Sequence, residues 1–294
     1  MELTTRNIVK KNFSWESKLV LSYQQNKVLK LPDNGIAKNR TGGIALGDGT
    51  FFGGIAEGEP LNRFYGYVAT GIIETEEQAA NANYDALSRL PQKGAKRVGD
   101  YEWADRNGDG QITTADQFCL GVTVPPFTGG LQNSFRLKNW TLSLYLDWAT
   151  GHSIFDESYS RYFYGTFTNN YALAKDVLKA WKKPGDKTKY AKFYANDSNW
   201  GNDNYNRRAT NTFTYKGDYL CLREITLQYS LPSKLFTKVG LKGVTLTVSG
   251  NNLYYFTEVK GISPEAGSST TYDGDVFYNY PPIRRFSFGV RLIF

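Results

Sequence analysis

Long runs of strictly alternating apolar and polar residues constrain this chain of 294 residues more than any other feature. Over residues 285–294, one face of an extended strand would carry Phe286, Phe288, Val290, Leu292 and Phe294. The opposite face would begin with arginine, serine, glycine and arginine. The runs at 13–24 and 141–149 show the same period of two. The chain is therefore predicted to form long antiparallel β-strands with one apolar face.

Strand length and loop asymmetry separate a membrane barrel from a soluble β-sandwich, which alternates in the same way. The runs are roughly 9 to 13 residues long, whereas globular strands have about 5 or 6, and this length suits a tilted membrane-spanning strand. Short turns at 9–12 and 136–140 contrast with the long connections 70–126 and 151–216, as in outer-membrane barrels. About nine strands are expected, at 2–8, 12–28, 42–57, 60–69, 127–138, 140–151, 217–230, 243–256 and 283–294.

The fold class predicted from these runs is all-β, an antiparallel transmembrane β-barrel segment with long external loops. Nine strands cannot close a bacterial barrel, so the missing strands must come from elsewhere. Slips of the apolar phase around Arg223 and Glu224, and near Gly250, predict a β-bulge in each of two strands. In the run at 141–149, the side chains predicted to face lipid are those of Leu142, Leu144, Leu146 and Trp148. Those predicted to face the lumen are Ser143, Tyr145 and Asp147.

Composition argues against a helical membrane protein and against an enzyme. The net charge is +7, the mean hydropathy is -0.47, and no run approaches the ~18 apolar residues of a spanning helix. His152 is the only histidine, so a catalytic site that needs two histidines is excluded, and one that needs a histidine beside a nucleophile would have to use His152. Cys119 and Cys221 are expected to be free thiols. The basic residues are spread through turns and loops, so no nucleic-acid partner is predicted.

Residues 105–116 follow the spacing of a calcium loop of the EF-hand kind. Gly110 permits the sharp turn at the sixth place, and Asp116 replaces the usual glutamate at the twelfth, where its shorter side chain would weaken affinity. Two interpretations stay open: a structural Ca²⁺ or other hard cation, or a polar turn that needs no ion. The candidate ligands are Asp105, Asn107, Asp109, the carbonyl of Gln111, and Asp116.

The longest connection, 151–216, is rich in aromatic residues set among asparagine and aspartate. Aromatic rings stack on the apolar faces of sugars, and amides or carboxylates bind hydroxyl groups, so this loop is a candidate for binding a glycan or a peptide. The alternative is that its aromatics form an internal core. A helix is expected near 172–181 and a shorter one near 75–88. The candidate substrate-binding residues are Tyr162, Tyr164, Trp200 and Tyr205.

A series of short motifs runs through nearly the whole chain in a fixed order. They are Phe64 to Tyr67 followed by Gly71 to Ile73; Asp105 to Asp116; Pro126 to Gly130 with Asn133 and Phe135; Tyr219 to Pro232; Ser249 to Leu253; Gly261 to Glu265; Tyr280 and Pro281; and Phe294. With these motifs, the chain resembles the C-terminal part of SusC/RagA-type TonB-dependent outer-membrane transporters.

The resemblance implies that residues 1–294 form part of a barrel of about 22 strands, with a plug in its lumen. The plug, the N-terminal strands, the signal peptide and the segment that contacts TonB would lie outside this sequence. Such transporters of the Gram-negative outer membrane import oligosaccharides or peptides. The implied partners are the remainder of the barrel and plug, a SusD-like surface lipoprotein, TonB and outer-membrane lipid.

The last residue, Phe294, ends an amphipathic run that resembles the signal by which outer-membrane barrels are recognised for insertion. It is therefore predicted to act in assembly rather than in transport. A second reading comes from another class of protein: a secreted, calcium-stabilised β-sheet module that binds glycans. Solubility without detergent would favour that second reading.

Overall fold

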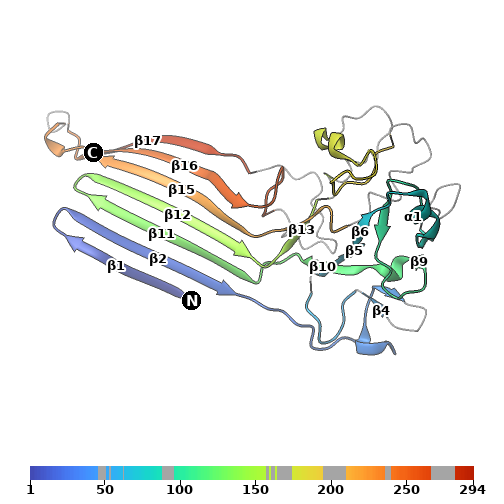
Figure 1. Ribbon diagram of the computed structural model, residues 1–294. Helices are drawn as coiled ribbons and strands as arrows, with labels where there is room; N and C mark the ends of the chain where they lie inside the picture. The colour runs from blue at the N-terminus through green and yellow to red at the C-terminus, as the bar shows by residue number, and fades with distance from the viewer. Residues whose placement is uncertain are drawn as a thin grey trace.

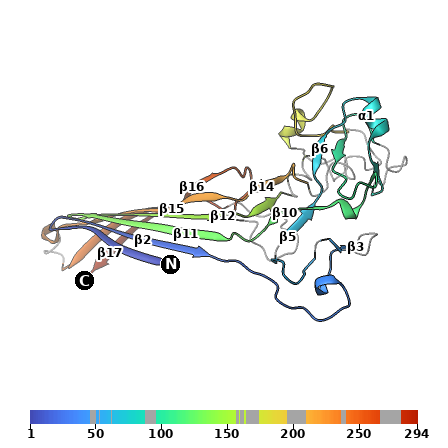
Figure 2. The ribbon, with the colours of Figure 1, turned by 60° about the horizontal axis from the view of Figure 1, so that its bottom comes forward.

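In the computed structural model, a long single-layered sheet carries a compact body at one of its ends (Figures 1 and 2). We call this body the cap; it is built from the described residues of 24–126 and 151–218. The structure describes residues 1–45, 51–52, 54–61, 63–87, 96–156, 159, 163, 174–194, 210–235, 240–265 and 282–294.

Seven antiparallel strands form the sheet, in the spatial order β1-β2-β11-β12-β15-β16-β17. The strands are β1 (Glu2–Lys10), β2 (Phe13–Tyr23), β11 (Phe127–Leu137), β12 (Trp140–Thr150), β15 (Tyr219–Ser230), β16 (Gly243–Thr257) and β17 (Arg285–Ile293). Their spatial order follows the chain, so the sheet is a meander interrupted by the cap. Lengths of 9 to 15 residues confirm the long strands predicted from the alternation.

Short and long connections leave opposite ends of the sheet. At one end, which we call the turn end, residues 11–12 join β1 to β2 and residues 138–139 join β11 to β12. Lys138 adopts a left-handed conformation there, with φ 51°. At the other end, 24–126 separate β2 from β11, and 151–218 separate β12 from β15. This asymmetry was expected from the sequence and matches that of outer-membrane barrels.

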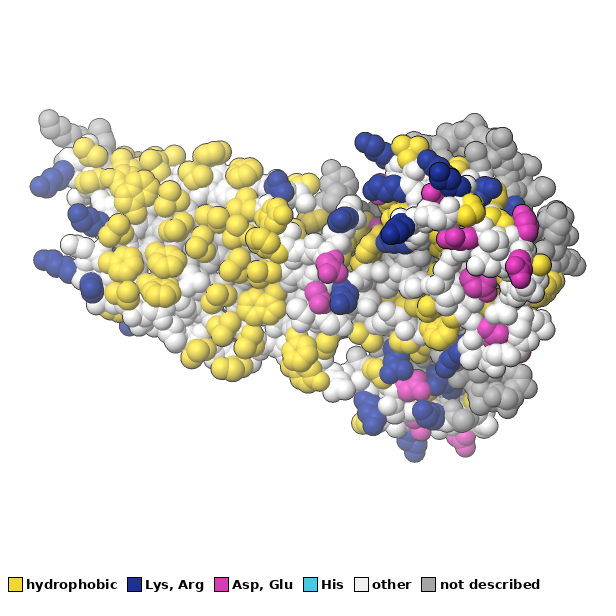
Figure 3. All heavy atoms as spheres, in the orientation of Figure 1, with side chains coloured by type: hydrophobic (Ala, Val, Ile, Leu, Met, Phe, Trp, Pro, Cys, Tyr) yellow, Lys and Arg dark blue, Asp and Glu magenta, His cyan; other side chains and the backbone are white. Residues whose placement is uncertain are grey.

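Strand pairing sorts the side chains of the sheet by polarity, because directly paired residues point to the same face. Leu142 of β12 pairs with Phe135 of β11 and with Leu227 of β15. The next residue, Ser143, points to the opposite face and pairs with Ser134. Hydrophobic side chains cover one side of the sheet in Figure 3, and we call this the apolar face. We call the other side the polar face.

Two neighbouring β-bulges shift the pairing in the middle of the sheet. Between the partners of Tyr145 and Leu146, strand β15 contains one extra residue, Arg223. Asn252 and Leu253 of β16 both stand opposite Arg223, and Asn252 has φ 53°. The two slips in apolar phase are thereby confirmed as bulges, and the bulge in β16 falls close to the expected position.

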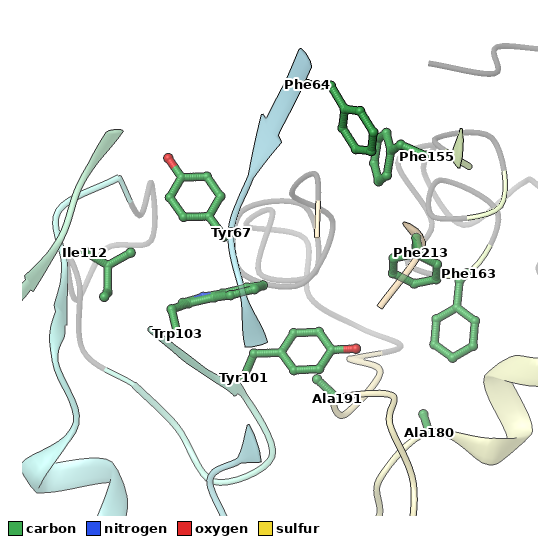
Figure 4. Packing of buried hydrophobic residues seen from close by; sticks show 10 residues of the cluster. All are labelled: Phe64, Tyr67, Tyr101, Trp103, Ile112, Phe155, Phe163, Ala180, Ala191 and Phe213. Atoms are coloured by element: carbon green, nitrogen blue, oxygen red, sulfur yellow. The ribbon is translucent and has the colours of Figure 1, made fainter. Parts of the chain in front are cut away.

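The cap has a hydrophobic core of its own, and both long connections contribute to it (Figure 4). The rings of Tyr101 and Trp103 lie 5.2 Å apart, and Phe163 stacks on Tyr190 at 4.4 Å. Its strands are β3 (Ile44–Ala45), β4 (Phe51–Phe52), β5 (Arg63–Gly66), β6 (Ala69–Ile72), β7 (Tyr84–Asp85), β8 (Tyr101–Trp103), β9 (Gln111–Ile112), β10 (Phe118–Val122), β13 (Ser153–Phe155) and β14 (Thr214–Lys216).

Two of the nine expected strands, 42–57 and 60–69, do not join the sheet in the described part of the chain. The first range instead contains β3 and β4, which pair with each other, and the second contains β5, which pairs with β10. Their alternation extends over two to four residues, which is too short to span a bilayer. The predicted number of strands was therefore wrong, while the other seven strands are confirmed.

The helices expected in the long connections are shorter than their patterns predicted. The first is α1 (Glu76–Asn81), which begins with a capping box between Thr75 and Gln78. The second, expected near 172–181, is the 3₁₀ turn η3 (Lys175–Lys179). Lys179 and Asp176 form an ion pair of 2.7 Å three residues apart, a spacing that suits the three residues per turn of a 3₁₀ helix. The remaining 3₁₀ turns are η1 (Ala37–Asn39), η2 (Thr114–Asp116) and η4 (Ser233–Leu235).

Candidate functional site: the polar wall and its anchored loop

The polar face carries a shallow hollow of about 420 Å³ near the cap end of β2, β11 and β12. Lys18 and Gln132 stand on neighbouring strands at one side of it, and Tyr145 stands beside them. The hollow exists partly because Gly130 has no side chain: a Cβ there would lie 3.0 Å from the ring of Tyr145. Amide, ammonium and phenol groups arranged in this way suit contact with a polar solute.

Arg223 organises the polar face beside this hollow. Its Nε donates to Oδ1 of Asp147 at 2.7 Å, and its Nη2 donates to Oδ2 of Asp147 at 2.8 Å. Its Nη1 donates to Oδ1 of Asn252 at 2.8 Å and to the hydroxyl oxygen of Tyr255 at 3.1 Å. The bidentate pair with Asp147 is the stronger, charge-assisted kind of hydrogen bond. One guanidinium therefore connects three strands of the wall.

Glu265 brings a loop from the cap end onto this cluster. Its carboxylate accepts a hydrogen bond from Nη2 of Arg223 and another from the hydroxyl of Tyr255, at 3.2 Å for the latter. The Glu265 backbone N–H donates to the hydroxyl of Ser263 at 3.2 Å. The segment 258–265, which follows β16, is thereby fastened to the polar wall.

His152 holds the same loop at a second point. Its Nε2 donates to the carbonyl oxygen of Pro264 at 3.1 Å, in a buried position. Gly217 makes room for the ring, since a Cβ at Gly217 would lie 2.3 Å from Nε2 of His152. Burial lowers the pKa of His152, so the neutral form is favoured. The only histidine of the sequence therefore acts as a structural donor.

Three ionisable side chains inside the cap, those of Lys96, Asp85 and Asp156, are buried and contact other groups of the chain. Lys96 and Asp85 are fully buried and lie 3.6 Å apart, and Lys96 also donates to the carbonyl oxygen of Tyr101 at 3.1 Å. Burial raises the pKa of Asp156 to about 6, opposed by a hydrogen bond of 2.8 Å from the backbone N–H of Tyr159. None of these groups has the spacing of a catalytic pair.

The predicted calcium loop folds as a compact turn whose carboxylates accept backbone hydrogen bonds. Asp105 accepts from the N–H groups of Gly108 and Gly110, at 2.7 and 2.8 Å. Asp116 is buried and accepts from the N–H groups of Arg106 and Thr113, at 2.9 and 2.7 Å. These bonds close the loop from both ends without using its remaining candidate ligands.

The other candidate ligands of this loop bond to one another or to the chain beside them. Nδ2 of Asn107 donates to Oδ2 of Asp109 at 2.8 Å, and Oδ1 of Asp109 accepts from the N–H of Gln111 at 2.8 Å. In the described ranges, no group of three or more acidic, histidine or cysteine side chains is placed to hold a metal ion. Calcium binding by Asp105, Asn107, Asp109, Gln111 and Asp116 stays a prediction.

Of the predicted substrate-binding aromatics, Tyr162, Tyr164, Trp200 and Tyr205 all lie outside the described residues. Their described neighbours pack inward: Phe163 is fully buried, and the ring of Tyr159 lies 6.1 Å from that of Phe213. Cys119 and Cys221 are free thiols, as expected. Phe294 follows β17 at the turn end and is 76% exposed.

The Arg223 cluster was not predicted as a unit. Asp147 lies 76 residues before Arg223 in the sequence, Glu265 lies 42 residues after it, and no local period joins them. The one usable signal was the slip in apolar phase at Arg223, because a bulge turns an additional side chain toward one face.

The chain is similar over nearly its whole length to TonB-dependent receptors of Formosa agariphila. TonB-dependent receptor P3 is 30% identical over 305 residues, which cover 99% of this chain and 28% of the receptor. TonB-dependent receptor P39 is 28% identical over 302 residues, covering 91% of this chain and 27% of the receptor. The chain thus spans less than a third of the length of these curated relatives. No family model matches it.

Solved structures with the same fold include the RagAB peptide transporter. That chain superimposes with a TM-score of 0.68 at 19% identity, over 99% of this chain and 28% of its own length. The RagAB peptide importer in the open-open state gives a TM-score of 0.69 at 20% identity, over 100% of this chain and 28% of that one. At this identity the likeness establishes the fold.

Three conclusions follow from the geometry and these relatives together. No helix in the described ranges is long and apolar enough to cross a membrane. The relatives are receptors and transporters, so the chain is not part of an enzyme. With its antiparallel two-faced sheet, the chain has the fold of the matching part of the RagAB transporter and a sequence similar to that of TonB-dependent receptors, as the resemblance to the C-terminal part of SusC/RagA-type transporters led us to expect.

Proposed function

We propose that the complete protein imports oligosaccharides or peptides across the outer membrane, with energy relayed through TonB and with a SusD-like surface lipoprotein as its partner. The observation that carries this proposal is the 30% identity to a TonB-dependent receptor over 99% of the chain. The RagAB transporter, which has the same fold, is a peptide transporter, and this supports peptides as one substrate class.

The two faces of the sheet support a place in the wall of a transport channel. An apolar face of this extent suits lipid, whereas the polar face, with its hollow and the Arg223 cluster, suits a water-filled lumen. A secreted glycan-binding module would expose the apolar face to water, where large apolar patches promote association. The transporter reading therefore accounts for both faces.

Uptake by cells tests this proposal directly. A strain that lacks the full-length gene, and the same strain with the gene restored, would be offered a labelled oligosaccharide mixture and a labelled peptide mixture. We expect restored uptake of one of the two mixtures, and loss of that uptake when TonB is inactivated. Uptake of both mixtures that is independent of the gene or of TonB would contradict the proposal.

Within this function, we assign the Arg223 cluster the role of holding the loop 258–265 against the channel wall. Replacing Glu265 by Gln in the full-length transporter removes the negative charge that accepts the hydrogen bond from Nη2 of Arg223. Since a hydrogen bond to a charged group is worth about 1.5 to 3 kcal/mol, the loop should be released from the wall in a measurable fraction of molecules. We expect lower uptake per assembled copy.

The matched control is Glu258→Gln, a change of the same kind in the same segment. Glu258 is exposed and lies outside the cluster, so uptake per copy should stay at the wild-type value. Equal uptake by both variants, with equal amounts in the membrane, would show that the anchored loop has no part in transport.

A further inference from the structure

Among the described residues, five lysines gather at the turn end of the sheet, beyond the last apolar residues of the strands. Figure 3 shows Lys and Arg side chains at this end, next to the hydrophobic side chains of the apolar face. All five are exposed, and none of them forms an ion pair in the described part of the chain. They are Lys10, Lys11, Lys138, Lys234 and Lys242, and we call them the lysine rim.

The sequence around the lysine rim contains no acidic residues. The segments 8–14, 134–141 and 227–246, which include all the turns at this end, contain no aspartate or glutamate. Against a net charge of +7 for the whole chain, the rim is a local concentration of positive charge.

The strand register places two of these lysines on the lipid side of the wall. Lys10 pairs with Phe13 and so shares the apolar face with it. Lys242 is two residues before Val244, which pairs with Leu292 on the same face. A lysine in such a position lays its aliphatic stem along the apolar surface and extends its ammonium group beyond the hydrocarbon.

Aromatic residues mark the edge of the apolar band directly above the lysine rim. The rings of Trp140 and Tyr229 lie 4.4 Å apart, and Trp140 follows the turn that contains Lys138. Tryptophan and tyrosine concentrate at the level of the lipid headgroups in membrane barrels. The ammonium groups of the rim therefore lie at the depth of headgroup phosphates.

We propose that the lysine rim binds the headgroups of anionic phospholipids in the membrane leaflet on the turn side. A lysine is a compact charge with three donors, well suited to a phosphate that approaches from several directions. Clusters of four to eight basic residues next to an apolar membrane segment attract anionic lipid. The acid-free turns and the lipid-side register are the two observations that single out lipid over a solute in the lumen.

Lipid retention by the full-length transporter tests the lysine rim. The purified protein would be titrated with phosphatidylglycerol in detergent, with phosphatidylethanolamine as the zwitterionic comparison, and bound lipid counted by native mass spectrometry. Each lysine is expected to raise the affinity for phosphatidylglycerol about fivefold. The triple variant Lys10→Gln, Lys11→Gln, Lys138→Gln should therefore bind this lipid about a hundredfold more weakly. The control triple variant Lys182→Gln, Lys183→Gln, Lys187→Gln changes the same number of exposed lysines in the cap and should bind like wild type.

A salt titration of the wild-type protein gives a second test that needs no variant. Retention of phosphatidylglycerol should fall as ionic strength rises, because exposed charges are screened. Equal binding of the two lipids, unchanged binding by the rim variant, or equal loss in the control variant would overturn the proposal. Displacement of phosphatidylglycerol by inorganic phosphate at equal concentration would also overturn it, by identifying a site for free anions.

Discussion

Asp156 shows how a single buried carboxyl sets the pH dependence of the cap. It is 2% exposed, and burial raises its pKa from the ordinary 3.8 to about 6. Between these two values the folded protein keeps a proton that the unfolded chain has released. The stability that Asp156 contributes is therefore complete below about pH 3.8 and is lost as the pH rises through about 6.

We expect Asp156→Asn to remove this dependence and to make the cap more stable at neutral pH. The amide oxygen of asparagine can still accept the hydrogen bond from the N–H of Tyr159. A shift of this size corresponds to at most about 3 kcal/mol. Hydrogen exchange of residues 154–156 in the full-length transporter, measured from pH 4 to pH 7, checks the prediction; a wild-type cap that gains protection over this range would contradict it.

At the scale of the strand, the two faces of β12 differ in their tolerance of charge. Leu144 is on the apolar face near the middle of the strand, and Ser143 is on the polar face beside it. Leu144→Arg should destabilise the assembled barrel by roughly 2 to 4 kcal/mol, because the charge would lie in the bilayer midplane. Ser143→Arg is the control, with an expected cost near zero.

Unfolding of the full-length transporter in lipid vesicles by denaturant measures both changes. Equal destabilisation by the two variants would show that β12 does not present the predicted faces to lipid and lumen. The faces themselves could be predicted from sequence, since a period of two over eleven residues admits one register.

The calcium prediction belongs to the turn between β8 and β10. If Asp105, Asn107, Asp109, Gln111 and Asp116 bind calcium, removing the ion with a chelator should loosen this turn, and adding it back should restore the turn. The measurement is the rate at which a protease cleaves the full-length transporter within 105–116. Unchanged cleavage over the whole calcium range would leave the backbone hydrogen bonds of Asp105 and Asp116 as the sole support of the loop.

The seven strands of the sheet could be predicted from the sequence, whereas the arrangement of the cap could not. In each strand of the sheet, apolar and polar residues alternate over nine or more residues, so each strand can be recognised from its own sequence. The cap strands are two to five residues long and depend on partners far away, as β5 depends on β10. The ranges 42–57 and 60–69 were misassigned because so short an alternation also occurs in a loop.

For the whole molecule, the end of β17 bears on assembly in the membrane. Its Phe286, Phe288 and Val290 are 65% to 80% exposed on an edge strand, and Phe294 follows them. An amphipathic edge of this kind can pair with the assembly machinery before it pairs with the rest of the barrel.

Deleting Phe294 from the complete transporter should therefore lower the amount assembled in the outer membrane more than the uptake per assembled copy. The measurement is the quantity of folded barrel in isolated outer membranes, compared with uptake by the same cells. Normal assembly combined with lost uptake would identify Phe294 as a transport residue instead.

Each of the two long connections, 24–126 and 151–218, leaves the sheet and returns to it at neighbouring positions on paired strands. Tyr23 pairs with Phe127 where the first long connection departs, and the N–H of Gln24 donates to the carbonyl oxygen of Pro126 at 2.9 Å. At the base of the second long connection, the N–H of Gly217 donates to the carbonyl oxygen of His152 at 2.8 Å. Each long connection is thus closed by backbone hydrogen bonds where it leaves the sheet, so a change in the cap is expected to leave the strand register beneath it undisturbed. Relatives that recognise different nutrients are then expected to share superimposable walls under dissimilar caps, so that ligand choice diversifies while insertion into the membrane is conserved.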